Sequence, residues 1–170
     1  MNRSGLVLWV GFMSMAAVGC SPQTPTPPAT AAKVSSPAAT GPAKPAATAD
    51  DNTWGTYLSE QGKIHGKDVA GNPYIYFIPS GDTPAAITRR KDEAQSIPTA
   101  IGPIVIPGSL LVLGGPDPQQ TNAFVLALTK TIKPNALHDV VVLIVSDASQ
   151  KDAITKAYAS TDATLRFVAM

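Results

Sequence analysis

The chain has 170 residues, of which 44% are apolar and 15% charged, with one cysteine and a formal net charge of +1. A single cysteine excludes an intrachain disulfide and a cysteine-rich zinc site. Over residues 54–170 ten basic side chains balance ten acidic ones, and because nucleic-acid binding needs clustered positive charge, no nucleic-acid partner is expected.

The first 19 residues have the pattern of a secretory signal peptide. Arg3 supplies a positive start, and the apolar run that follows, 6–18, is 13 residues long. A helix needs roughly 20 apolar residues to span a bilayer. A short apolar run between a positive start and small residues is typical of a signal that is removed after export.

The apolar run ends at Ala17-Val18-Gly19-Cys20, which resembles the lipobox of bacterial lipoproteins, although that family most often has Leu where this chain has Ala17. The resemblance implies that the Cys20 thiol receives a diacylglycerol, that the peptide is cut before Cys20, and that the new amino group is acylated, typically by palmitate. Two or more acyl chains hold a protein firmly on a bilayer. Ser21, in place of Asp, implies an outer-membrane anchor that faces the periplasm.

Residues 20–53 are predicted to be a disordered tether. The stretch after the cysteine is rich in Pro, Ala and Thr and contains one large apolar residue, Val34, so it cannot bury enough surface to offset the entropy of ordering. Residues 54–170 are long enough for one domain with its own core. At the junction, Trp54 and Tyr57 are expected to pack on the domain, or else to be exposed anchors for a partner.

The domain is predicted to be α/β, with a small, mainly parallel sheet flanked by helices. Apolar runs predict strands over 74–78, 110–113, 140–145 and 165–168. The third run is continuous, as expected of a strand that is covered on both faces. We therefore expect Leu143 and Ile144 to be buried.

Three helices are predicted between these strands. Thr83-Pro84 and Asp117-Pro118 each place a capping side chain before a proline that suits the first helical position. Ser149 and Asp152 resemble a capping box at the start of the third helix. Pro134-Asn135 is predicted to end the second helix, Arg89-Arg90-Lys91 to be a solvated helix face, and Ile104-Val105-Ile106 to be a short edge strand or the first arm of a bend into the second strand. The residues of the second and third helices that are predicted to face the core are Phe124, Leu128, Ile132, Ile154, Ala157 and Tyr158.

The candidate ligand site lies where the predicted strands end. In parallel sheets the carboxyl ends of the strands meet at one edge, where such sheets bind ligands. The residues at that edge are Asp82, Gly114, Gly115, Asp117 and Asp147. The three carboxylates would suit a hard cation. Alternatively, the glycine amides and the start of the helix after them would suit an anion. The interpretation that we favour is structural, because the same residue types serve as helix caps and turns.

Motifs of catalysis are missing from the sequence. There is no nucleophile elbow and no His-Glu-x-x-His, and His65 and His138 are far apart. His138 precedes the third predicted strand, at the edge opposite Asp147, so a role as general base is not favoured. The sequence predicts a lipid-anchored protein-binding module without enzymatic activity, cofactor or resident metal, acting on another envelope protein as an accessory of an envelope machine or as an inhibitor. The alternatives are a small-ligand or metal-binding lipoprotein that uses the carboxyl edge, and an enzyme that uses Asp147 or His138.

Overall fold

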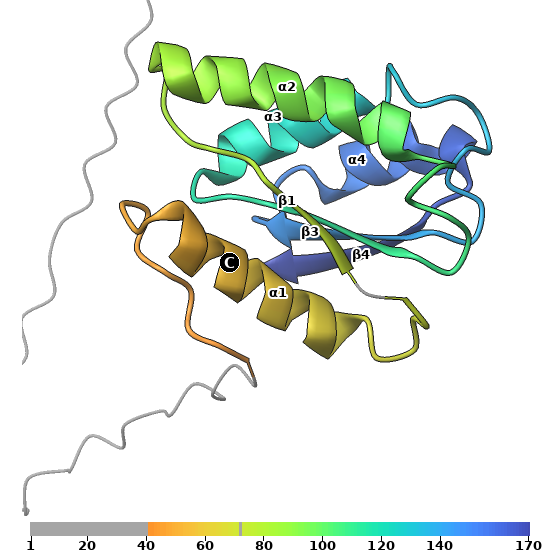
Figure 1. Cartoon of the computed structure of the whole chain (residues 1–170), viewed down its shortest axis with the longest axis horizontal. Helices are drawn as coiled ribbons and strands as arrows, with labels where there is room; N and C mark the ends of the chain where they lie inside the picture. The colour runs from red at the N-terminus through yellow and green to blue at the C-terminus, as the bar shows by residue number, and fades with distance from the viewer. Residues whose placement is uncertain (1–40, 72) are drawn as a thin grey trace, which may run out of the picture. The chain divides into compact units, whose positions relative to one another are not determined.

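A computed structural model of the chain describes residues 41–71 and 73–170 (Figure 1). The predicted signal peptide, Cys20 and the tether as far as residue 40 lie outside the described residues. The elements in chain order are α1 (Asp51–His65), β1 (Pro73–Phe77), α2 (Pro84–Ala100), β2 (Leu110–Gly114), α3 (Pro118–Leu128), β3 (Val141–Ser146), α4 (Lys151–Tyr158), the 3-10 turn η1 (Ala159–Thr161) and β4 (Thr164–Ala169).

The four strands form one parallel sheet in the order β1-β2-β3-β4. This confirms the predicted α/β class. Each strand pairs with the next one in sequence, and parallel crossovers keep the same hand, so the connecting helices α2, α3 and α4 all lie on one face of the sheet. Helix α1 lies on the other face (Figure 1).

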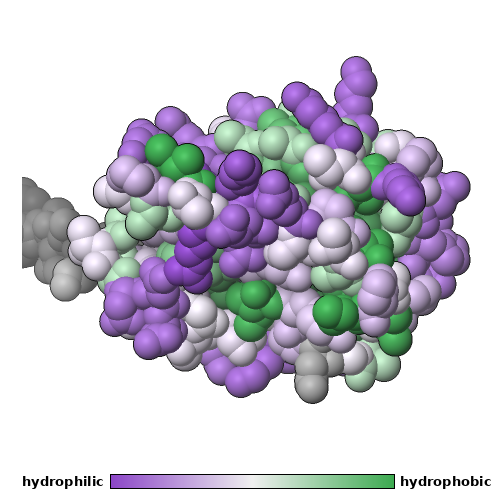
Figure 2. Space-filling view, turned by 45° about the horizontal axis from the view of Figure 1, so that its top comes forward, coloured by the Kyte–Doolittle hydropathy of each residue, from purple (hydrophilic) through white to green (hydrophobic). Residues whose placement is uncertain are grey.

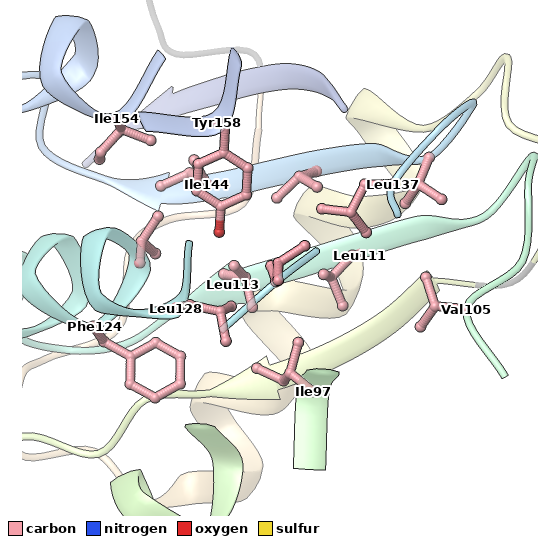
Figure 3. Packing of buried hydrophobic residues seen from close by; sticks show 14 of the residues in the cluster. Ile97, Val105, Leu111, Leu113, Phe124, Leu128, Leu137, Ile144, Ile154 and Tyr158 are labelled. Atoms are coloured by element: carbon pink, nitrogen blue, oxygen red, sulfur yellow. The ribbon is translucent and has the colours of Figure 1, made fainter. Parts of the chain in front are cut away.

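The larger part of the core fills the space between the sheet and α2–α4. Ile144 of β3 is 1% exposed and packs with side chains from β2 and the three helices (Figure 3). Leu143, its neighbour along β3, is fully buried on the opposite face. Both faces of β3 are therefore covered, as its continuous apolar run predicted. Figure 3 also shows Tyr158 of α4 inserted among these side chains, and its buried hydroxyl has no hydrogen-bond partner among the described residues.

Helix α1, which the sequence analysis did not predict, covers the second face of the sheet. Trp54 is fully buried and Tyr57 is 6% exposed, so they are core residues and not exposed anchors. The Trp54 indole N–H donates to the carbonyl of Ala46 at 3.1 Å, and the Asp50 carboxylate caps the helix through the Thr53 amide. The folded domain therefore begins before Trp54, and it includes the start of α1 at Asp51, within the predicted tether of residues 20–53.

Two details of the predicted helices are wrong. Helix α3 ends at Leu128 and does not continue to Pro134. The hydroxyl groups of Thr129 and Thr131 bond carbonyl oxygens three residues earlier, and such side-chain bonds compete with a further helical turn. Helix α4 has no side-chain cap, so the predicted capping box at Ser149 does not form.

An ion pair ties the last strand to the turn after α1. The Arg166 guanidinium on β4 makes two hydrogen bonds to the Asp68 carboxylate, Nη1 to Oδ1 at 2.7 Å and Nη2 to Oδ2 at 2.6 Å, and a third to the carbonyl of His65. Hydrogen bonding to Arg166 lowers the pKa of Asp68 from its usual 3.8 to about 2.

This ion pair predicts a loss of stability in acid. Because the pKa of Asp68 is lower in the folded than in the unfolded chain, its contribution is complete above about pH 5 and disappears as the pH falls from 3.8 towards about 2. The free energies of unfolding of the native chain and of Asp68→Asn, measured in urea, should differ at pH 6 and differ less at pH 2. Asp92→Asn, at an exposed position of α2, is the control. An equal difference between native chain and Asp68→Asn at both pH values would contradict the assignment.

Candidate functional site

The loops after β1, β2 and β3 lie side by side at the carboxyl edge of the sheet. The strand register aligns Phe77 with Gly114, and Gly114 with Val145. The candidate residues that follow these strands are therefore at one edge, as the predicted topology required. Their side chains, however, have separate partners.

Asp117 caps α3. Its Oδ1 accepts hydrogen bonds from the amides of Gln119, at 2.9 Å, and Gln120, at 3.1 Å. These amides have no partner within the helix, so a carboxylate oxygen at this position stabilises the start of α3. The capping role that the sequence predicted for Asp117 is confirmed.

Asp147 connects the loop after β3 to α3. Its Oδ1 accepts from Asn122 Nδ2 at 3.0 Å and from the Ser149 amide at 2.9 Å, and the Ser149 hydroxyl donates to the same oxygen. These hydrogen bonds, that of the Ser149 hydroxyl first, lower the pKa of Asp147. Asn122 is 2% exposed. Ser149 therefore bonds Asp147 and does not cap α4.

The Asp82 side chain is mostly exposed, and its Oδ1 lies 3.4 Å from Nη2 of Arg90. The Arg90 guanidinium organises this corner, because its Nη1 donates to the carbonyls of Pro79 and Gly81 and to Gln120 Oε1, at 2.6–3.0 Å. It joins the turn after β1 to α3. Sequence reasoning treated this basic segment as a solvated helix face and missed Arg90.

A signal for Arg90 was present in the sequence. Arg90, Ala94 and Ile97 are separated by four and three residues, which places them on one side of α2. Ile97 is fully buried and Ala94 packs against the core. The spacing therefore indicates that Arg90 faces inward, where a guanidinium needs acceptors for its N–H groups.

The two glycines are explained by close packing. A Cβ on Gly115 would lie 2.0 Å from the carbonyl oxygen of Ile78, and one on Gly114 would lie 2.5 Å from Leu58 Cδ2. Neither glycine has the positive φ that a side chain would disfavour. The absence of a side chain lets α1 and the end of β1 approach β2 closely. An anion is not needed to account for these residues.

The carboxyl edge contains two separate hollows. One, of about 370 Å³, lies between α2 and α3 and includes Asp82 and Arg90. The other, of about 420 Å³, lies between α3 and α4 and includes Asn122 and Ser149. No group of three or more His, Cys, Asp and Glu side chains in the described ranges could hold a metal ion. The sheet winds in one direction from β1 to β4, so it lacks the reversal of strand order at which open α/β sheets form a single crevice.

His138 lies at the opposite edge, as predicted, and forms a surface ion cluster. Its Nδ1 is 2.6 Å from Asp162 Oδ2, and its Nε2 is 3.3 Å from Asp139 Oδ2. The hydrogen bond to Asp162, together with both negative charges, raises the pKa of His138. Because Asp162 precedes β4 and His138 precedes β3, the cluster fastens two neighbouring loops.

An exposed apolar loop lies between α2 and β2, over residues 101–109, and we call it the isoleucine loop. In the described part of the chain the large apolar side chains that are well exposed are Ile87 at 49%, Ile104 at 54% and Ile106 at 52%. Two of the three belong to this loop. Figure 2 shows separate hydrophobic patches among hydrophilic residues on one face of the domain.

The backbone of the isoleucine loop is held by hydrogen bonds and a buried anchor. Val105 is 1% exposed and forms a bridge with Ile101. The Ile104 amide donates to Ala100, and the Ile106 amide to the Ser109 hydroxyl. The segment that includes Ile104 was predicted to be an edge strand or the first arm of a bend into β2. Both predictions are wrong. The segment is a fixed turn that presents two isoleucines to solvent.

Comparison of the chain with known protein families, with curated proteins and with solved structures finds no match. Within the described ranges no helix combines the length and the hydropathy needed to cross a membrane.

Proposed function

We propose that this chain is a lipid-anchored protein of the bacterial envelope, attached through Cys20, whose α/β domain binds another envelope protein and catalyses no reaction. The anchor is supported by the sequence Ala17-Val18-Gly19-Cys20 and the signal peptide before it. The binding role is supported by one observation above all, the isoleucine loop.

The isoleucine loop has the properties of a binding surface. Ile104 and Ile106 are each more than half exposed, and exposed apolar groups on a fixed backbone release water when a partner covers them. Because Val105 anchors the loop in the core, little conformational entropy remains to be lost on association. The separate hollows at the carboxyl edge offer less, because their polar side chains already have partners. At one hollow Asp82 bonds Arg90, and at the other Asn122 and Ser149 bond Asp147.

The test is an affinity purification of the tagged full chain from detergent-solubilised membranes. Ile104→Ser/Ile106→Ser removes the apolar surface, and Ile87→Ser is the matched control, since Ile87 is equally exposed but lies on α2. A stoichiometric partner should be recovered with the native chain and with Ile87→Ser, and at least tenfold less with the double variant. The partner should also be recovered with Cys20→Ser when this variant is supplied in the periplasm.

The anchor is tested separately by labelling with radioactive palmitate. Label should enter the native chain and not Cys20→Ser, and only the native chain should remain with the membrane fraction. Equal labelling of both chains would contradict the lipid anchor. Full recovery of a partner with the double isoleucine variant, or no partner at all, would contradict the binding role of the loop; the second outcome would favour a small ligand at the 420 Å³ hollow.

A further inference from the structure

We propose that the outer edge of β4 pairs with the same edge of a second copy of this chain, so that two four-stranded sheets join into one. Among the described residues, strand β4 is the last in the sheet and pairs only with β3. All six of its residues are half-buried or exposed. An unpaired strand edge is a ready acceptor for another strand. This surface is distinct from the isoleucine loop and does not depend on the proposed function.

Three residues of β4 direct their backbone groups outward. The amides of Thr164 and Met170 donate inward, to carbonyl oxygens of the chain at and before β3. Successive residues of a strand alternate in the direction of their N–H and C=O groups. The outward groups therefore belong to Leu165, Phe167 and Ala169, which form a regular row along the edge.

In the described part of the chain, the opposite edge of the sheet is protected, whereas the β4 edge has no such protection. Strand β1 begins with Pro73, and Arg89 lies over the ring of Phe77, 5.1 Å from its centroid. Proline and charged side chains at a strand edge prevent the addition of another strand. Strand β4 contains no proline or glycine, and its one charged residue, Arg166, is turned towards Asp68 on the α1 face.

The sequence of β4 is complementary to itself in one antiparallel register. With Phe167 on the twofold axis, Leu165 pairs with Ala169 of the second copy, so every outward-facing residue meets another and each pair exchanges both hydrogen bonds. Arg166 is then opposite Val168 of the second copy. A shift of the axis to Arg166 would place two guanidinium groups opposite each other, which is unfavourable. The charge pattern therefore favours the register centred on Phe167 over the one centred on Arg166.

Space for the side chains of the second copy exists on both faces of β4. A groove of about 560 Å³ beside α4 is lined by Leu165 and Phe167, and one of about 710 Å³ beside α1 is lined by Val168 and Met170. Lys151 Nζ lies 5.6 Å from the Phe167 ring centroid, so a dimer brings two lysines near its axis. Because salt screens their repulsion, association should strengthen with moderate ionic strength.

Disulfide cross-linking tests the register. In the full chain carrying Cys20→Ser, Phe167→Cys introduces the single thiol, and residues paired on the axis have Cα atoms about 5.5 Å apart, within disulfide range. Mild oxidation should convert most of the protein to a covalent dimer. Leu165→Cys is the matched control, since its counterpart is displaced by about 14 Å along the strand at about 3.4 Å per residue. Leu165→Cys/Ala169→Cys should cross-link again.

Sedimentation tests association without a cross-link. The native chain in density-matched detergent should be a dimer, and Phe167→Glu and Phe167→Lys should each be monomeric, because like charges would face each other on the axis. An equimolar mixture of these two variants should form a heterodimer, which a merely unfolded variant could not do. Ala153→Glu, on the exposed side of α4, should remain dimeric. A native monomer, equal cross-linking of the two single-cysteine variants, or a product between Phe167→Cys and a different protein would overturn the proposal.

Discussion

Replacing Trp54 with Ala is expected to lower the free energy of unfolding by about 3–5 kcal/mol, the usual range for truncating a buried aromatic residue. Trp54 is fully buried and packs edge-on against Tyr57, with their ring centroids 5.6 Å apart. It belongs to the cluster by which α1 covers the sheet. The substitution also removes the indole donor that holds Ala46 against the helix. Urea unfolding followed by far-UV circular dichroism measures the loss.

Trp54→Phe is the informative companion to this variant. It retains most of the aromatic surface but not the hydrogen bond to Ala46, so it should cost less than Trp54→Ala. Limited proteolysis should also cut residues 41–50 faster in both variants, since the indole no longer holds this segment. A loss below about 1 kcal/mol for Trp54→Ala would mean that α1 is not part of the folded core.

Replacing Ile144 with Ala is expected to cost about 2–5 kcal/mol, because it leaves a cavity in the centre of the sheet. Ile144 is 1% exposed on β3, which has a strand on either side, and it faces the cluster under α2–α4 (Figure 3). The surrounding strands and helices are bonded to one another and can collapse only partly around the missing atoms. The free energy comes from the urea midpoint and slope.

Ile87→Ala is the matched control for Ile144→Ala, since the same atoms are deleted from a side chain that is 49% exposed on α2. Its cost should be within about 0.5 kcal/mol of zero, as for most surface substitutions. Similar losses for the two variants would contradict the central position of β3. An unchanged denaturant slope would show that both variants retain the native change in exposed surface on unfolding.

The candidate site residues are of two kinds: one has its partners close by in the sequence, and the other has them on a different element of the fold. Asp117 could be assigned from its neighbours, because a cap acts on amides two and three residues away. Asp82 and Asp147 could be placed at the correct edge, but their partners could not be identified. Arg90 contacts Asp82 across a turn, and Asn122 contacts Asp147 from 25 residues away. Each of the three carboxylates therefore bonds its own partners.

Helix α1 shows why part of the fold escaped prediction. Its sequence contains Gly55 and Gly62, which lower its helix propensity. It is stabilised by the sheet that it covers. Gly62 faces Val112 of β2, where an added Cβ would be 3.2 Å from a methyl carbon. This reason for a glycine in mid-helix is visible only after the two elements are packed.

The four strands and the helix starts at Thr83 and Asp117 follow from the sequence alone, because hydrophobic runs and caps act within a few residues of chain. The signal peptide and the lipid anchor at Cys20 stay predictions. Only the folded arrangement shows that Trp54 is a core residue, that Gly115 gives room to the Ile78 carbonyl, and that β4 forms an edge of the sheet in the described residues. These properties depend on residues far apart in sequence, which meet only when the sheet has formed. Local preferences specify elements, whereas packing specifies which surfaces remain free to bind.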